Sequence, residues 1–330
     1  MTVAVPPLLV WRWLPALAGL VAATPAVLVT GLVDVRSGVV LGVGMIPSLV
    51  IGIPRDRRRR VLILAASLIL GVPITVGATV SPWPVLACTT MFLLPVVATW
   101  GGPRLHRPRL ALLLIILAPP LVGIGLSLDG WRTGVTITGL FIAGGVITFA
   151  VAVALPEHWL AEPADGPVTP TALPGIPYGV LVGLVGLVAA TIGFLLDLDH
   201  VGWACAAALL VMRPDALLQQ WRTMGRFVSV LVGASAATGL VELGVAPWAV
   251  AVAVAVALVA AAATRGSRWY ILPTFTTFLV ILMLSYPDPA QATGRLTERV
   301  SETVLGLVVA AVVGIGGSAL IRRRDHASAP

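Results

Sequence analysis

Long apolar stretches, separated by short polar or proline-containing breaks, run along almost the whole chain of 330 residues. Most of them approach the length of roughly 20 residues that a helix needs to cross the hydrocarbon core of a bilayer. Backbone groups must be satisfied within lipid, and the stretches lack the alternation of a membrane β-barrel, so the pattern predicts helices. We expect twelve spans, near residues 14–32, 37–53, 61–80, 82–99, 110–127, 133–155, 178–196, 200–212, 227–243, 247–264, 270–285 and 300–321.

Composition supports this all-α polytopic membrane fold. Hydrophobic residues make up 58% of the chain and charged residues only 11%, and the mean hydropathy is +1.02. These values lie far from those of soluble globular domains. The lipid bilayer is therefore the expected environment, with the span at 200–212 the shortest of the set.

Arginine orients the predicted bundle, because short cytoplasmic loops retain positive charge. With the N-terminus inside, 17 of the 21 cationic residues, all of them arginines, fall on the cytoplasmic side. The remaining four fall outside: Arg36, Arg132, Arg295 and Arg299. We therefore expect a cell (inner or plasma) membrane protein with both termini in the cytoplasm. Topology alone accounts for the net charge of +7, so no nucleic-acid partner is expected.

The second half of the chain repeats the first with an offset of roughly 162 to 166 residues. Matching pairs are Asp34 with Asp197, Gly71 with Gly233, Pro82 with Pro247, and Trp83 with Trp248. The predicted organisation is a first six-helix repeat at 1–155, a proline-rich cytoplasmic linker at 156–177, a second six-helix repeat at 178–321 and a basic tail at 322–330. Six spans per copy make the two repeats parallel, an arrangement common among transporters.

Several kinds of chemistry are missing from the sequence. The chain has no lysine, which excludes a P-loop and a Schiff-base site. It also lacks the His-Glu-x-x-His, Gly-x-Ser-x-Gly and Cys-x-x-Cys patterns. Cys88 and Cys205 lie inside predicted spans as small packing residues. We expect neither an enzyme nor a bound cofactor or metal.

Two segments carry a family resemblance. Trp203 begins a short span that ends in Arg213-Pro214-Asp215, and the later segment from Gly294 to Gly306 contains Arg299, Glu302 and Thr303. Together they resemble the fusaric acid resistance (FUSC) family of aromatic acid exporters. The resemblance implies two six-helix membrane halves, an aromatic or hydrophobic organic acid as cargo, and proton-driven export. Related plant malate channels are dimers of one half, so a homo-oligomer is compatible with it.

Residues 215–226 are predicted to form an amphipathic cytoplasmic helix that lies at the membrane interface. Asp215, Gln219, Arg222 and Arg226 fall on one face at helical spacing. Leu217, Trp221, Met224 and Val228 fall on another. Arg222 and Arg226 are either ordinary positive-inside anchors or part of a site for the substrate carboxylate.

Arg299, Glu302 and Thr303 form the most informative polar cluster. The positive-inside rule gives no reason for Arg299, and Glu302 and Thr303 follow it at i+3 and i+4, on the same helical face. Polar groups within a membrane are costly and commonly functional, although a structural clamp between the halves is the alternative. Arg36 and Arg132 are further cations that topology does not require, and all three arginines are candidates to line the path of an anion.

Five residues are candidates for proton coupling: Asp34, Asp197, Asp199, His200 and Glu242. Carboxylates beside a water-filled path can take up and release protons, and histidine titrates near neutrality. The alternative for the loop residues is an ordinary solvated polar loop.

The sequence thus favours an exporter of small organic anions. One rival is a passive anion channel, which would use the same arginines without proton coupling. A second rival is a membrane scaffold of the cell envelope that transports nothing.

Overall fold

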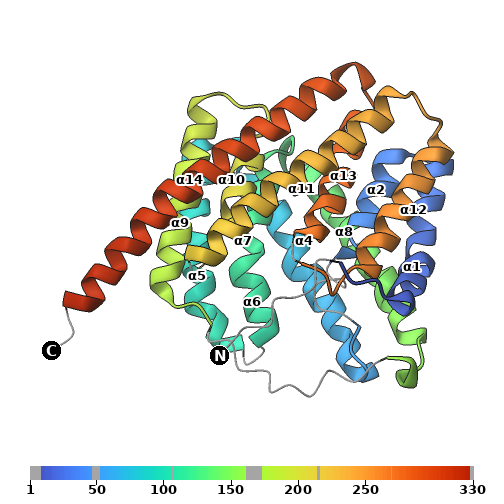
Figure 1. The fold of residues 1–330 in the computed structure, drawn as a ribbon, viewed down its shortest axis with the longest axis horizontal. Coiled ribbons are helices and arrows are strands. Elements are labelled where there is room, and N and C mark those ends of the chain that lie inside the picture. The colour runs from blue at the N-terminus through green and yellow to red at the C-terminus, as the bar shows by residue number, and fades with distance from the viewer. Residues whose placement is uncertain are drawn as a thin grey trace. The chain divides into compact units, whose positions relative to one another are not determined.

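The computed structural model describes residues 9–46, 53–105, 108–160, 173–213, 216–268 and 270–327, and this part of the chain contains helices and turns but no strand. Figure 1 shows the helices by their labels. They are α1 (Trp13–Leu32), α2 (Val35–Val43), α4 (Leu62–Val80), α5 (Pro84–Gly101), α6 (Pro108–Ile116), α7 (Ala118–Leu126), α8 (Gly130–Ala154), α9 (Ile176–Leu195), α10 (Val201–Val211), α11 (Ala216–Glu242), α12 (Pro247–Ala263), α13 (Ile271–Ser285) and α14 (Ala292–Ala327). Short 3-10 turns precede α4, α6 and α14, and another follows α8.

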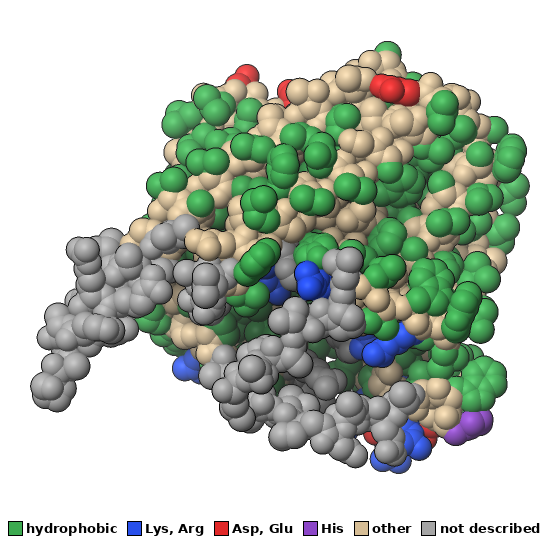
Figure 2. Space-filling view, viewed as in Figure 1, with side chains coloured by type: hydrophobic (Ala, Val, Ile, Leu, Met, Phe, Trp, Pro, Cys, Tyr) green, Lys and Arg blue, Asp and Glu red, His purple; other side chains and the backbone are tan. Residues whose placement is uncertain are grey.

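Six helical segments within the described residues are long and apolar enough to cross a membrane: 13–32, 57–80, 84–105, 130–154, 176–195 and 218–242. The helices α10, α12 and α13 are shorter and equally apolar. Large hydrophobic side chains such as Leu17, Val85 and Val256 are exposed, and hydrophobic side chains cover much of the visible face in Figure 2. Such a surface is stable only against lipid. The protein is a multi-pass membrane protein, and the full count of twelve spans stays a prediction.

One predicted span, 110–127, is wrong as a single helix. The structure has two nine-residue helices there, α6 and α7, which meet at Leu117. Pro119 and Pro120 follow directly and occupy the first turn of α7. Proline lacks an N–H and clashes with the preceding turn, so it starts a new helix more readily than it continues one.

The predicted interfacial helix at 215–226 is also wrong. Residues 216–242 form one continuous helix, α11, with no break before the predicted span at 227–243. Its polar face points inward, since Arg226 is 4% exposed, whereas Trp221 on the apolar face is 73% exposed. A helix at the water interface would place its charges outward. Pro214 and Asp215, which also entered the predictions, lie outside the described residues, as do the side chains of Arg109 and Arg322 to Arg324.

The described helices form two compact units. Unit 1 comprises residues 1–68, 139–168 and 228–299, and unit 2 comprises 69–138, 169–227 and 300–330. In unit 1, α1 packs along α12 and against α2. Close contact depends on small residues, because a Cβ on Gly19 would lie 2.7 Å from the Cβ of Ala262. The backbone N–H of Arg12 also donates to the carbonyl of Ala263, at 2.9 Å.

In unit 2, α9 packs along α5, and α10 packs against both α7 and α9. A Cβ on Gly202 would lie only 1.7 Å from the carbonyl oxygen of Gly123, so the backbones of α10 and α7 touch there. The core around this contact includes Met91, Val185 and Cys205. The short α10 is buried along nearly its whole length, which explains how a helix of 11 residues remains in a membrane protein.

Each unit draws helices from both predicted repeats. Unit 1 joins α1 and α2 of the first repeat to α12 and α13 of the second. Unit 2 joins α9 and α10 of the second repeat to α5 and α7 of the first. Each compact unit is therefore built from helices of both predicted repeats. The evolutionary relation between the two repeats stays a prediction.

Candidate transport site

The helix α14 carries a buried polar face. Arg299, Glu302 and Thr303 are 4%, 2% and 0% exposed, and all three lie on one side of the helix. The backbone carbonyls around them are used by the helix itself, so these side chains do not serve as helix caps. Burying ionisable groups in a membrane protein is costly unless they serve a partner, a cavity or a substrate.

The position of this face is fixed by close packing of α14 on α10. A Cβ on Gly306 would lie 2.2 Å from the carbonyl oxygen of Ala204, so only glycine allows the two backbones to meet. Further along, Gly314 lies against the side chain of Met212. Both helices therefore run in the same direction within unit 2. Glu302, one turn before Gly306, is within electrostatic range of Cys205 in α10.

The first part of α11 contacts α14 as well. The side-chain amide of Gln219 donates to the carbonyl of Ala310 in α14, at 2.9 Å. The two helices run in opposite directions, as Figure 1 shows. Arg226 comes seven residues after Gln219, and Thr303 comes seven residues before Ala310. Since each residue adds 1.5 Å along a helix, the register places Arg226 level with Thr303. Buried Arg226, Glu302 and Thr303 thus converge within unit 2.

A second polar cluster lies at the end of α10. The hydroxyl of Tyr178 donates to the carbonyl of Met212 at 3.1 Å, and Arg213 donates to the same oxygen. Burial lowers the pKa of the Arg213 guanidinium, and the nearby Tyr178 partly offsets this effect. Arg222 lies within electrostatic range of both residues. The sequence prediction missed Tyr178 and Arg213 as neighbours of Arg222, although the Arg-Pro-Asp turn pointed to this end of the helix.

Arg60 was assigned only to topology, yet it is the most completely buried arginine of the described chain. Its guanidinium donates to the carbonyls of Val153 and Leu155 at 3.3 and 2.8 Å and to that of Ala152, at the end of α8. It also donates to two loop carbonyls, those of Pro54 and Arg55, each at 3.0 Å. The last carbonyls of a helix lack partners within the helix. Arg60 therefore caps α8, and no sequence signal near Arg60 indicated this distant partner.

Arg36 and Arg132 are both exposed. Arg36 lies in the first turn of α2. The guanidinium of Arg132 lies 5.7 Å from the centre of the Trp131 ring, a separation within the range of a cation–π interaction. Arg36 and Arg132 are thus exposed, whereas Arg299 is buried, so the three arginines lie in different environments.

The candidates for proton coupling are exposed or half-buried and mostly have local roles. Asp34 accepts a hydrogen bond from the backbone N–H of Ser37 at 2.7 Å and so caps α2. This hydrogen bond is the main reason that the pKa of Asp34 is lowered. Glu242 accepts a hydrogen bond from the hydroxyl of Thr293. His200 stacks on Trp203 with ring centres 4.2 Å apart.

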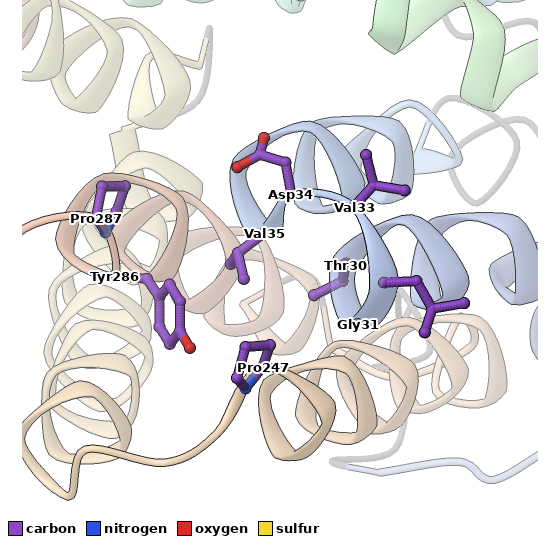
Figure 3. A pocket seen from close by; sticks show the side chains of 9 residues that line it. Thr30, Gly31, Val33, Asp34, Val35, Pro247, Tyr286 and Pro287 are labelled. Carbon is purple, nitrogen blue, oxygen red and sulfur yellow. The ribbon is translucent and has the colours of Figure 1, made fainter.

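Asp197 and Asp199 belong to one of two similar surface hollows. In unit 1, a hollow forms where the turn from Thr30 to Val35 meets Pro247 and Tyr286, as Figure 3 shows. In unit 2, another forms where the turn from Asp197 to Val201 meets Pro82 and the end of α7. Asp34 and Asp197 are matching residues of the predicted repeats, as are Pro247 and Pro82. The two hollows therefore occur at corresponding places of the repeat.

Comparison with known proteins supports the family resemblance. Residues 188–313 match the family model described as fusaric acid resistance protein-like, so the resemblance predicted from the sequence is confirmed over that segment. The matched segment includes α10 to α13 and the buried face of α14. No curated protein and no solved structure gives a significant match to the chain.

Proposed function

We propose that this protein is a membrane transporter that exports small aromatic or hydrophobic organic acids. The observation that carries the proposal is the burial of Arg226, Glu302 and Thr303 where α14 packs against the apolar α10 and against α11, a helix of membrane length. The family match over the same helices supports a transport role. A carboxylate anion can cross such an environment only where cations and hydrogen-bond donors replace its water.

Each residue of the candidate site would have a role in transport that follows from its chemistry. Arg226 would hold the cargo carboxylate and Thr303 would donate a hydrogen bond to it, and Arg299, one turn before Thr303 in α14, would be a further cation on the path. Arg222, nearer the end of α10, would receive the anion on its way to Arg226. The exposed Arg36 and Arg132 would attract or release anions at the predicted outer surface.

Glu302 is the favoured proton carrier. It is 2% exposed, whereas Asp34, Asp197, Asp199 and Glu242 are exposed. A buried carboxylic acid is the one whose proton affinity changes most when a charged ligand enters or leaves beside it. Asp34 and Glu242 are exposed and accept hydrogen bonds from Ser37 and Thr293, which gives them local roles.

The direct test is transport by the purified protein in liposomes. A panel of aromatic carboxylates would be loaded, and efflux measured with and without an imposed proton gradient. Gradient-driven accumulation supports a proton-coupled exporter. Movement that follows only the anion gradient identifies a passive channel, and no movement of any compound contradicts the proposal and favours a scaffold.

Two variants assign the roles within the site. Arg299→Ala should reduce carboxylate export at least tenfold while insertion stays normal, because the predicted inside arginines still set topology. Glu302→Gln should abolish gradient-driven accumulation but retain downhill leak, because glutamine keeps the shape and exchanges no proton. Wild-type transport rates in both variants would assign this face of α14 to structure alone.

A further inference from the structure

We infer that the protein has a single transport path, lined by the second predicted repeat, and that the corresponding place in the first repeat is a closed packing seam. This inference rests on the proposed function and says which half of the chain performs it. It starts from residues that occupy matching positions in the two repeats.

The shift that pairs Pro82 with Pro247 also pairs α8 with α14. It places Thr138 opposite Thr303, so the hydroxyl is kept, and both threonines are buried. The same shift places Gly134 opposite Arg299 and Ile137 opposite Glu302. Both charges of the candidate site on α14 are thus missing from the first repeat.

The helices α4 and α11 show the same difference. The shift that pairs Gly71 with Gly233 also pairs Ser67 with Ser229, and both serines are buried. It pairs Leu64 with Arg226. At these positions the first repeat has the same buried serine as the second. It has the apolar Leu64 where the second repeat has the buried cation Arg226.

Helices of the first repeat pack closely at the position that matches Arg299. A Cβ on Gly134 would lie 2.5 Å from the Cβ of Ala78, so α8 and α4 are in close contact where the second repeat has Arg299. A Cβ on Gly125 of α7 would lie 2.2 Å from the carbonyl oxygen of Ile74, which closes α4 against α7 as well. In the first repeat, close apolar packing therefore occupies the place that Arg299 has in the second.

The hydroxyls of this seam are used internally. Thr75 donates to the hydroxyl of Thr138 at 2.8 Å, and Thr138 donates to the carbonyl of Gly71 at 3.0 Å. A buried hydroxyl satisfied in this way joins α8 to α4 and has its donor engaged. Thr138 is thus a packing residue, whereas its counterpart Thr303 lies on the same face as Arg299 and Glu302.

Matched variants of the two repeats test the inference in reconstituted liposomes. Thr303→Val, and the double variant Arg226→Leu with Glu302→Ile that copies the first repeat, should each reduce organic-acid efflux at least tenfold. Thr138→Val and Ser67→Ala should keep efflux per folded molecule within about twofold of wild type, even if Thr138→Val lowers the melting temperature.

Water access gives a second measurement that does not depend on the folding of Thr138→Val. In a background with Cys88 and Cys205 replaced by alanine, a small charged thiol reagent should modify Thr303→Cys and block efflux. It should not modify Thr138→Cys.

The outcomes separate the inference from the proposed function. Equal loss of efflux in Thr138→Val and Thr303→Val, with both folded, or modification of Thr138→Cys, would overturn the single path and leave the transporter assignment standing. Unchanged efflux in every variant of the second repeat would overturn the single path and the roles given to Arg226, Glu302 and Thr303, whereas no efflux from the wild-type protein would overturn the proposed function itself.

Discussion

Two regions of this protein bury charge inside apolar helices, at different places along the helix. At the end of α8, Arg60 is fully covered, and its guanidinium donates to backbone carbonyls of α8 and of the loop that leads to Arg60 itself. In the interior of α14, Arg299 and Glu302 are buried where the helix already uses its own carbonyls. Burial alone therefore does not identify a functional charge. Its place relative to a helix end separates a structural cation from a candidate site.

The largest effect on stability is expected from removing the Arg60 cap. Arg60→Met should destabilise the protein by roughly 3–5 kcal/mol, because several buried carbonyls lose their donor at once. Thermal unfolding of the detergent-solubilised protein measures the change. Arg59→Met is the matched control, because the Arg59 side chain is 75% exposed and its contact with Asp56 spans 3.7 Å. Equal stability of the two variants would contradict the capping role.

For the buried charges near α14 we expect little change in stability but a large loss of transport. Replacing Arg226 and Glu302 together with methionine should leave stability within about 1–2 kcal/mol of wild type or raise it, since apolar residues of similar volume often replace buried charges without loss. Transport should nevertheless fall at least tenfold. Unfolding curves and liposome efflux of the same preparation provide the comparison. A variant that is unstable but still transports would reverse our assignment of the two regions.

A smaller effect is expected where α14 meets α10. Gly306→Ala should cost about 1–3 kcal/mol, because its Cβ would meet the Ala204 carbonyl at 2.2 Å and push the helices apart. Gly316→Ala in the same helix has nothing within 4 Å of the new Cβ and should be neutral or slightly stabilising. If both variants melt at the same temperature, the close approach of α14 to α10 is not what fixes the buried face.

The smallest effect concerns Asp34, where the structure favours a cap over a proton carrier. Asp34→Ala should cost about 1 kcal/mol, and Asp34→Asn much less, because asparagine also caps helices. The lowered pKa of Asp34 means that its charged form stabilises the fold at neutral pH. This contribution should disappear as the pH falls through that lowered pKa. Loss of proton-driven accumulation in Asp34→Asn would instead assign Asp34 to coupling.

The sequence was most informative for features that depend on local pattern. Apolar length predicted a helix for each expected span. However, 110–127 proved to be two helices that meet before Pro119 and Pro120, and α2 ends at Val43, well inside the expected span 37–53. Helical spacing placed Arg299, Glu302 and Thr303 on one face, and the structure buries all three. The family resemblance was also legible, because its motifs lie in continuous segments that the family model matches.

The interfacial helix at 215–226 failed for a physical reason. Amphipathic periodicity shows that a helix has two faces but not which solvent each face meets. Near water the polar face points outward. In α11, Gln219 contacts α14 and Arg226 is buried on the same face, whereas Trp221 is exposed.

The sequence by itself thus determined the membrane class, the helical segments and the residue types that carry charge into them, because hydropathy and helical spacing act over a few turns. Only the tertiary structure decided that Arg60 caps α8, that Gly306 brings Glu302 close to α10, and that helices of both repeats share each compact unit. These outcomes depend on contacts between residues far apart in the chain, which no local pattern encodes. For the same reason the sequence singled out the polar face at Arg299 but gave no sign that Gly134, its matching residue, lies close against Ala78 of α4.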